Sequence, residues 1–221
     1  MKWLFNKNEN SYPDYWTRYN ACFLDAKPID INTATYVVLD TETTGFNYDK
    51  DKILCIGAVK IIDGSIDIST AFEIYIKQDY FDEDSVKIHG IIKNERIETV
   101  SEEEAVVMFL EYIEDAILVA HHAFYDITMI NKALQRLELP KLKNSVVDTM
   151  FIYKATRTNS TTIDAKKKYT LDELAENYDI DLSDRHNAAG DALITALAFI
   201  KAVSFLVKNK NYTLKELLTH K

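Results

Sequence analysis

Two acidic residues, Asp40 and Glu42, close the first run of strand-forming residues in the chain. Side chains two positions apart on a strand point to the same face, so both carboxylates can reach one point beyond the end of the strand. Open α/β sheets bind their ligands at that edge. Neighbouring carboxylates repel each other, and a hard cation such as Mg²⁺ or Mn²⁺ relieves the repulsion. Alone, such a pair is more often a capping acid beside a solvent-exposed one.

Three further residues have the right chemistry to join this pair. Asp126 lies early in a predicted helix, where a negative charge also suits the helix dipole. His186 and Asp191 bound the segment HNAAGD. If a helix begins near Asn187, the histidine lies in the loop before it and Asp191 in an early turn, so both can face one site. Taken singly, Asp126 is an ordinary first-turn acid, and such a histidine is more often a surface or capping residue.

Together, these four acids fall at the ends of separate elements around one sheet edge. Two metal ions roughly 3.5–4 Å apart could bind among them, as in sites that cleave phosphodiesters. One ion would lower the pKa of a bound water, and the other would stabilise the leaving 3′-oxygen. His186, with an ordinary pKa near ~6.5, could take the proton of the water.

The pattern of apolar residues predicts an α/β domain with a mixed sheet of five strands flanked by helices. Residues 1–33 are rich in aromatic side chains and are predicted to form a short helical extension packed on the main domain, residues 34–221. Strands are predicted at residues 36–39, 53–62, 66–76, 116–120 and 145–147. Helices are predicted at residues 102–113, 124–137, 171–178 and 187–207, with a last short one after Thr213. Residues 156–168 are predicted to form an exposed polar loop.

The composition excludes several classes of protein. A formal net charge of −9 counts against a general nucleic-acid coating protein, which is normally basic, so any affinity for nucleic acid must be local and salt-sensitive. Cys22 and Cys55 cannot build a disulfide framework or a thiolate zinc site, and they favour a reducing, cytoplasmic setting. The apolar stretches at residues 1–10 and 192–207 are too short for a signal peptide and a membrane span, so no membrane partner is expected.

Three segments, DTETTG (40–45), AHHAFYD (120–126) and HNAAGD (186–191), occur in this order. On them the chain resembles the DEDDh, or DnaQ-like, 3′–5′ exonucleases, and within these the proofreading epsilon group of bacterial DNA polymerase III. The resemblance covers about residues 35–203 and implies an RNase H-like fold with two divalent cations, Mg²⁺ or Mn²⁺. The implied metal ligands are Asp40, Glu42, Asp126 and Asp191, and the implied catalytic residues are His186, as general base, and Glu42.

The resemblance also implies substrate contacts. Thr43, Thr44 and Gly45 would lie along the terminal nucleotide, and His89 belongs to a segment like the loop that borders the active site of the family. His122 stands where the family usually has asparagine, so the contact that the asparagine would make with the nucleotide or backbone is open. Tyr125 stands where the family has phenylalanine, which is a mild change.

The expected activity is stepwise release of nucleoside 5′-monophosphates from the 3′ end of single-stranded or frayed DNA. The alternative is an exoribonuclease or oligoribonuclease, because nothing in the motifs reads the 2′-hydroxyl group. A third reading is a non-catalytic adaptor that binds nucleic acid or a polymerase, although such a module has no need to keep four converging acids. A DNA polymerase subunit is a further expected partner.

Overall fold

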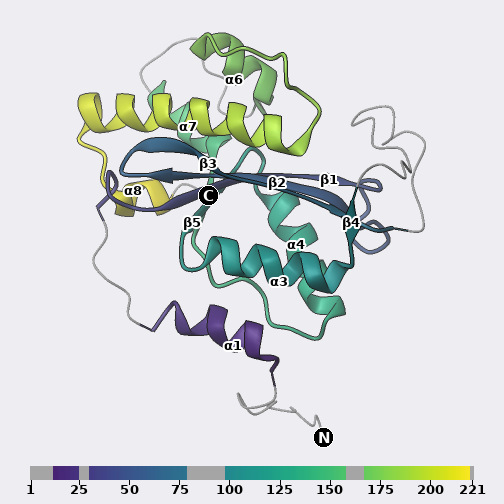
Figure 1. Ribbon diagram of the computed structural model, residues 1–221. Coiled ribbons are helices and arrows are strands. Elements are labelled where there is room, and N and C mark those ends of the chain that lie inside the picture. Colours follow the sequence, from purple (N-terminus) through teal and green to yellow (C-terminus); the bar gives the residue numbers. More distant parts are fainter. Residues whose placement is uncertain (1–11, 25–29, 79–97, 158–166, 220–221) are drawn as a thin grey trace, which may run out of the picture.

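A mixed sheet lies at the centre of the computed structural model, which describes residues 12–24, 30–78, 98–157 and 167–219 (Figure 1). Its strands lie in the order β4-β3-β2-β1-β5-β6. The central strand β1 pairs antiparallel with β2 and parallel with β5. The strands are β1 (Tyr36–Thr43), β2 (Ile53–Ile62), β3 (Ser65–Ile76), β4 (Thr99–Val100), β5 (Ile117–Ala120) and β6 (Val146–Asp148).

The α/β class is confirmed, and so are the five predicted strands. The predicted strand number is wrong by one, because the described residues form a sheet of six strands. The additional strand is β4, which is two residues long and pairs in parallel with Tyr75 and Ile76 at the end of β3. A segment of two residues cannot show the alternation from which strands are predicted.

Side chains cap several helices of the described residues, whereas α1 and α4 follow Pro13 and Ala123 and have no side-chain cap. Ser101 and Thr170 each form a capping box with the glutamate three residues later. One helix, α5, was not predicted; Asp148 caps it, and its buried residues are spread too widely for a periodic apolar face. The helices are α1 (Asp14–Ala21), α3 (Glu102–Ile113), α4 (Phe124–Arg136), α5 (Thr149–Thr156), α6 (Leu171–Tyr178), α7 (Ala188–Lys210) and α8 (Leu214–Thr219).

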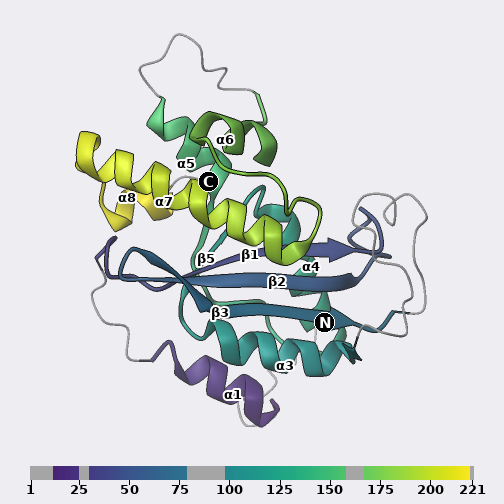
Figure 2. The same ribbon diagram turned by 45° about the horizontal axis from the view of Figure 1, so that its top comes forward.

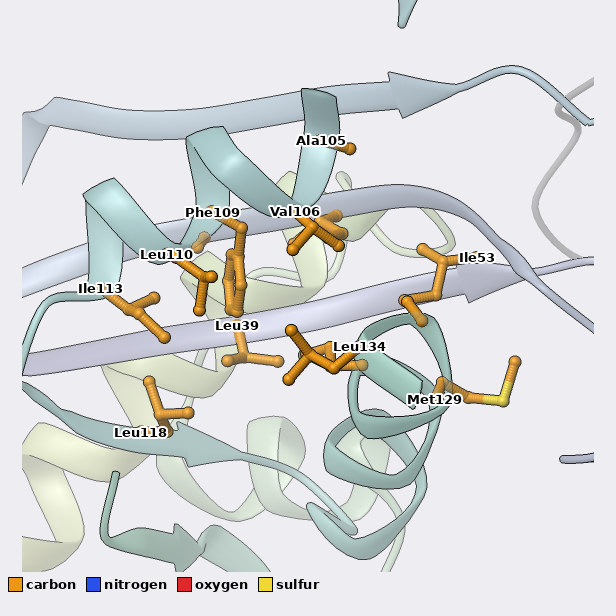
Figure 3. Close-up of a cluster of buried hydrophobic side chains, with 14 of the residues drawn as sticks. Leu39, Ile53, Ala105, Val106, Phe109, Leu110, Ile113, Leu118, Met129 and Leu134 are labelled. Atoms are coloured by element: carbon orange, nitrogen blue, oxygen red, sulfur yellow. The ribbon is translucent and has the colours of Figure 1, made fainter. Parts of the chain in front are cut away.

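Helices cover both faces of the sheet (Figures 1 and 2). Helices α3 and α4 cover one face, and α7, with α6 beyond it, covers the other. The alternation along β1 divides its side chains between these layers: Val37 and Leu39 pack toward α3 and α4, whereas Tyr36 and Val38 pack toward α7. Figure 3 shows Leu39 in the first of these cores, below Phe109 of α3.

Helix α7 is the longest helix of the described residues and packs against β1 and β2. Its 23 residues are long and apolar enough to cross a membrane by length and composition alone, but 61% of its most apolar stretch is buried inside the fold. The helix extends beyond the apolar run at residues 192–207, which by itself is too short for a membrane span. Because most of its apolar stretch is buried, its place in the core explains its apolar character.

Helix α1 packs on α3 and contributes to the first of these cores (Figure 2). Trp16 and Tyr19 of this helix are buried. The Tyr19 hydroxyl donates a hydrogen bond to Asn144 Oδ1 at 2.6 Å and accepts one from the Lys143 N–H at 2.8 Å. These contacts join α1 to the segment that leads into β6.

Gly57 allows the first turn of α7 to lie directly on β2. In the strand register, Gly57 is opposite Asp40 of β1. A Cβ atom at Gly57 would lie 2.2 Å from the backbone of Ala188 and Ala189, closer than real Cβ contacts allow. The absence of a side chain at this position therefore fixes how near α7 comes to the end of β1.

We expect Gly57→Ala to push the first turn of α7 away from β2 and to lower the free energy of unfolding by about 1–3 kcal/mol, the usual cost of overpacking. Urea unfolding followed by circular dichroism measures this change. Glu73→Ala, at the exposed residue paired with Gly57 on β3, is the matched control and should stay within about 0.5 kcal/mol of the wild type. Equal stabilities of the two variants would show that α7 is not held by this contact.

Candidate active site

Asp40, Glu42 and Asp191 meet at the end of β1. Asp40 and Glu42 share the face of β1 that Tyr36 and Val38 turn toward α7, and Asp191 comes from the first turn of α7. One carboxylate oxygen of each of the three residues lies within 4.8 Å of the others. The two strand acids are half-buried and Asp191 is buried, so the group opens to the surface on the side of β1.

Asp126 reaches the same end of β1 from the opposite layer. Its Oδ1 atom accepts hydrogen bonds from the Thr41 N–H at 3.0 Å and from the Thr41 hydroxyl at 2.7 Å. The parallel pairing of β1 with β5 ends at Val38 and Val119, and the N–H of Thr41 lies beyond that last pair. Asp126 is not part of the three-oxygen group, but it is close enough to raise the pKa values of Asp40 and Glu42.

Burial and mutual repulsion both oppose ionisation of this group. Burial is the main cause that raises the pKa of Asp40, and the carboxylates of Asp126, Asp191 and Glu42 add to it. Burial, followed by the charges of Asp191 and Asp126, raises the pKa of Glu42 to about 7. Among the described residues, Asp191 Oδ1 is a buried atom without a hydrogen-bond partner. An all-oxygen donor set with an unpartnered buried carboxylate oxygen fits a hard divalent cation.

Arg185 is the site residue that sequence reasoning missed. Its Nη1 atom lies 2.5 Å from Asp191 Oδ2, and its Nε atom lies 2.5 Å from Asp172 Oδ1 on α6. The guanidinium also lowers the pKa values of Asp40 and Glu42, against the larger effects that raise them. No periodic pattern could indicate this contact, because Asp172 and Arg185 belong to different elements.

The loop before α7 presents His186 at the surface. Asn187 caps the helix through a hydrogen bond from the Gly190 N–H at 3.0 Å, as expected for a helix that starts there. His186 has a left-handed backbone with φ of 67° and an exposed side chain. Gly190 lets the loop fold back on the helix, since a Cβ atom there would lie 2.0 Å from the Asp184 carbonyl oxygen.

The hydroxyl groups of the segment after β1 point into the protein. Thr43 Oγ1 lies 2.9 Å from the Gly45 carbonyl oxygen and 2.6 Å from the Tyr125 hydroxyl. The Thr44 hydroxyl donates to Asp51 Oδ1 at 2.9 Å, and a Cβ atom at Gly45 would collide with the same carboxylate. The hydroxyl groups of Thr43 and Thr44 are therefore engaged within the protein.

An exposed aromatic surface borders this segment. Phe46 and Phe124 are 72% and 74% exposed. Their rings contact Tyr125 and Tyr48, with centroid distances of 6.1 Å and 6.0 Å. The hydroxyl of Tyr125, absent from the usual phenylalanine, donates to the Gly45 carbonyl oxygen at 2.8 Å and ties α4 to the segment.

The turn between β5 and α4 is held by Asp148. The Asp148 carboxylate accepts hydrogen bonds from the N–H groups of His122, Ala123 and Met150 at 3.2, 3.0 and 2.9 Å. His122 is half-buried in the left-handed region, with φ of 56°, where asparagine, aspartate and histidine are enriched. Histidine can therefore replace asparagine here without a change in the backbone.

His121 has a structural environment. Its Nδ1 and Nε2 atoms each lie 2.9 Å from a partner, the Thr149 hydroxyl and the Tyr169 carbonyl oxygen. Burial is the main cause that lowers its pKa to about 3, so the ring is neutral. With both ring nitrogens engaged, His121 is not available for a zinc site with His122. His89 lies outside the described residues.

Comparisons with known proteins identify the family of this chain. The family model described as exonuclease matches residues 37–199. Over 180 residues the chain is 34% identical to the PolC-type DNA polymerase III of Staphylococcus aureus; the match covers 80% of this chain and 12% of that protein. The chain therefore spans a small part of the length of this relative.

Two solved structures share the fold. Exonuclease X, solved in complex with 5′ overhanging duplex DNA, has a TM-score of 0.61 and 20% identity, over 83% of this chain and 97% of that one. The zinc ion bound form of the E. coli exonuclease I–single-stranded DNA complex has a TM-score of 0.65 and 18% identity, over 81% and 41%. They confirm the predicted RNase H-like fold. The chain belongs to the DnaQ-like 3′–5′ exonuclease family.

The raised pKa of Glu42 predicts how the stability of the metal-free protein depends on pH. The pKa of this group is ordinarily 4.5 and is about 7 in the folded protein. Between these values the folded protein binds more protons than the unfolded chain, so the free energy of unfolding falls as pH rises. We expect the Tm in EDTA to fall across this interval, and to fall less in Glu42→Gln.

Calorimetric melts at several pH values, with EDTA or with Mg²⁺, measure this effect. A divalent cation should remove most of the fall, because it offsets the charge of the ionised group. A Tm in EDTA that is flat or rising over the interval, with Glu42→Gln parallel to the wild type, would contradict the electrostatic description of the site.

Proposed function

We propose that this protein is a metal-dependent exonuclease that removes nucleoside 5′-monophosphates from the 3′ end of a DNA strand. The observation that carries the proposal is the meeting of Asp40, Glu42 and Asp191 within 4.8 Å, with Asp126 held beside them by Thr41. Membership of the exonuclease family supports the same reaction. Sites of this kind hydrolyse phosphodiesters through bound divalent cations.

The carboxylates would hold two cations, Mg²⁺ or Mn²⁺. Asp40, Glu42 and Asp191 offer converging oxygens for one ion, and Asp126, whose charge acts on Asp40, would help to hold a second. Such ions, when bound, activate water and stabilise the charge that develops on the leaving oxygen. The protein positions these oxygens through β1 and the first turns of α4 and α7.

We infer that His186 is the general base. Its exposed imidazole belongs to the loop before α7, five residues before Asp191 in the chain. A histidine that is open to solvent beside a bound water can accept the proton of the attacking water. Glu42 would assist as the second catalytic residue, by binding the ion that polarises this water.

Single-stranded or frayed DNA is the proposed substrate, because the solved relatives were crystallised with duplex DNA bearing an overhang and with single-stranded DNA. The exposed rings of Phe46 and Phe124 offer surfaces on which bases can stack. His122, at the turn between β5 and α4, would contact the strand, and the backbone of the Thr43–Gly45 segment would follow the terminal nucleotide. Likeness to a PolC-type polymerase favours a polymerase as partner.

The activity should depend on the metal and on the strand acids. With 5′-labelled single-stranded DNA and Mg²⁺ or Mn²⁺, we expect a ladder of products shortened one nucleotide at a time from the 3′ end. EDTA and Asp40→Asn should each abolish the ladder. Asp49→Asn, which removes an exposed carboxylate paired with Lys132, is the matched control and should retain activity. A ladder that persists in EDTA would exclude the proposed mechanism.

A labelled RNA strand of the same sequence, assayed in parallel, measures whether the enzyme prefers deoxyribose or ribose in its substrate. Faster release of nucleotides from RNA than from DNA would show that the protein is a ribonuclease. The proposed metal chemistry would be unaffected by this result.

Replacement of the proposed base should separate proton transfer from metal binding. We expect His186→Ala to lower kcat by roughly 10²–10⁴-fold, the usual contribution of general base catalysis, while divalent cations still protect the variant against thermal unfolding. Added imidazole should restore part of the rate. An unimpaired kcat would show that another group accepts the proton.

A further inference from the structure

Arg185 bridges two helices at the edge of the acidic group. Its Nη1 atom contacts Asp191 Oδ2, and its Nε atom contacts Asp172 Oδ1, both at 2.5 Å. The side chain of Asp191 is 8% exposed, whereas that of Asp172 is 55% exposed. The guanidinium therefore joins one buried carboxylate in the site to one carboxylate at the surface.

The contact with Asp191 engages one oxygen of a carboxylate that a metal ion would also bind. Asp191 belongs to the three residues whose oxygens lie within 4.8 Å of one another. Its Oδ2 atom is taken by Arg185, while Oδ1 is buried without a partner among the described residues. A guanidinium and a divalent cation at the same carboxylate repel each other, so the two positive groups compete for Asp191.

We propose that Arg185 is a built-in counter-ion of the active site, which neutralises Asp191 when no metal ion is present and gives this carboxylate up when a divalent cation binds. This inference rests on the proposed metal-dependent function. When Arg185 Nη1 leaves Asp191, the exposed carboxylate of Asp172 can keep its contact with Arg185 Nε. Asp172 therefore holds the arginine in the metal-bound state.

The exchange has a consequence for the loop that carries the proposed base. Arg185 directly precedes His186, and the Asp184 carbonyl oxygen packs against Gly190 of α7. While Arg185 contacts Asp191, this contact attaches the backbone next to His186 to the acidic group. Release of this contact by a cation would remove one attachment of the loop and leave the loop held by the Arg185–Asp172 pair and by Asp184 against Gly190.

Titration of Mn²⁺ into the metal-free protein by calorimetry tests the competition directly. We expect Arg185→Gln to bind Mn²⁺ about tenfold or more tightly than the wild type, because a charge-assisted hydrogen bond no longer has to be broken. The Tm of this variant in EDTA should be lower than that of the wild type, and saturating Mn²⁺ should narrow the difference.

Two further variants separate local competition from a general effect of charge. Arg157→Gln removes an arginine that contacts Asn177 and the ring of Tyr153 outside the site, and it should bind Mn²⁺ as the wild type does. Arg185→Lys keeps the charge but cannot reproduce the planar two-carboxylate bridge. It should therefore bind Mn²⁺ more tightly than the wild type and less tightly than Arg185→Gln.

Equal or weaker Mn²⁺ binding by Arg185→Gln would overturn the counter-ion role while leaving the proposed nuclease intact. Binding by Arg185→Lys identical to the wild type would also overturn it, because only the long-range charge would then matter. If neither the wild type nor Arg185→Gln binds Mn²⁺, both this inference and the proposed metal mechanism fail.

Discussion

Repulsion between carboxylates is the constraint on which the rest of this structure depends. Asp40, Glu42 and Asp191 bring oxygens within 4.8 Å of one another, and Asp126 adds a fourth negative charge from the other face of the sheet. Burial deepens the cost, because it removes the water that would screen them. A ligand of opposite charge offsets this repulsion and stabilises the arrangement. Hard divalent cations are the ligands that oxygen donors prefer.

The fold holds these groups together through backbone contacts more than through the acids themselves. Gly57 lets α7 lie on β2 opposite Asp40, and Gly190 lets the loop with His186 fold back on α7. Asp148 fixes the turn before α4 by accepting backbone hydrogen bonds. The site is therefore built at the point where three helix or strand ends converge, and small residues permit that convergence.

The sequence was sufficient to predict the strand that carries the first motif and the helices α3 and α6, because the continuous apolar run of β1 and the capping residues of these helices are local signals. It also indicated that Asp40 and Glu42 share a face, which follows from their spacing alone. It could not indicate β4, which is too short to alternate, or α5, whose burial is not confined to one face. Arg185 escaped prediction because its partner Asp172 is brought near only by the packing of α6 on α7.

We propose that the four acids form one metal site with the base at its rim. Diffraction from crystals soaked with Mn²⁺ and a nucleoside 5′-monophosphate, recorded at a wavelength where manganese scatters anomalously, tests it most directly. We predict two anomalous peaks roughly 3.5–4 Å apart, bounded by Asp40, Glu42, Asp126 and Asp191, with the phosphate of the nucleotide between them. Peaks elsewhere on the protein, or no manganese among these carboxylates, would contradict the account.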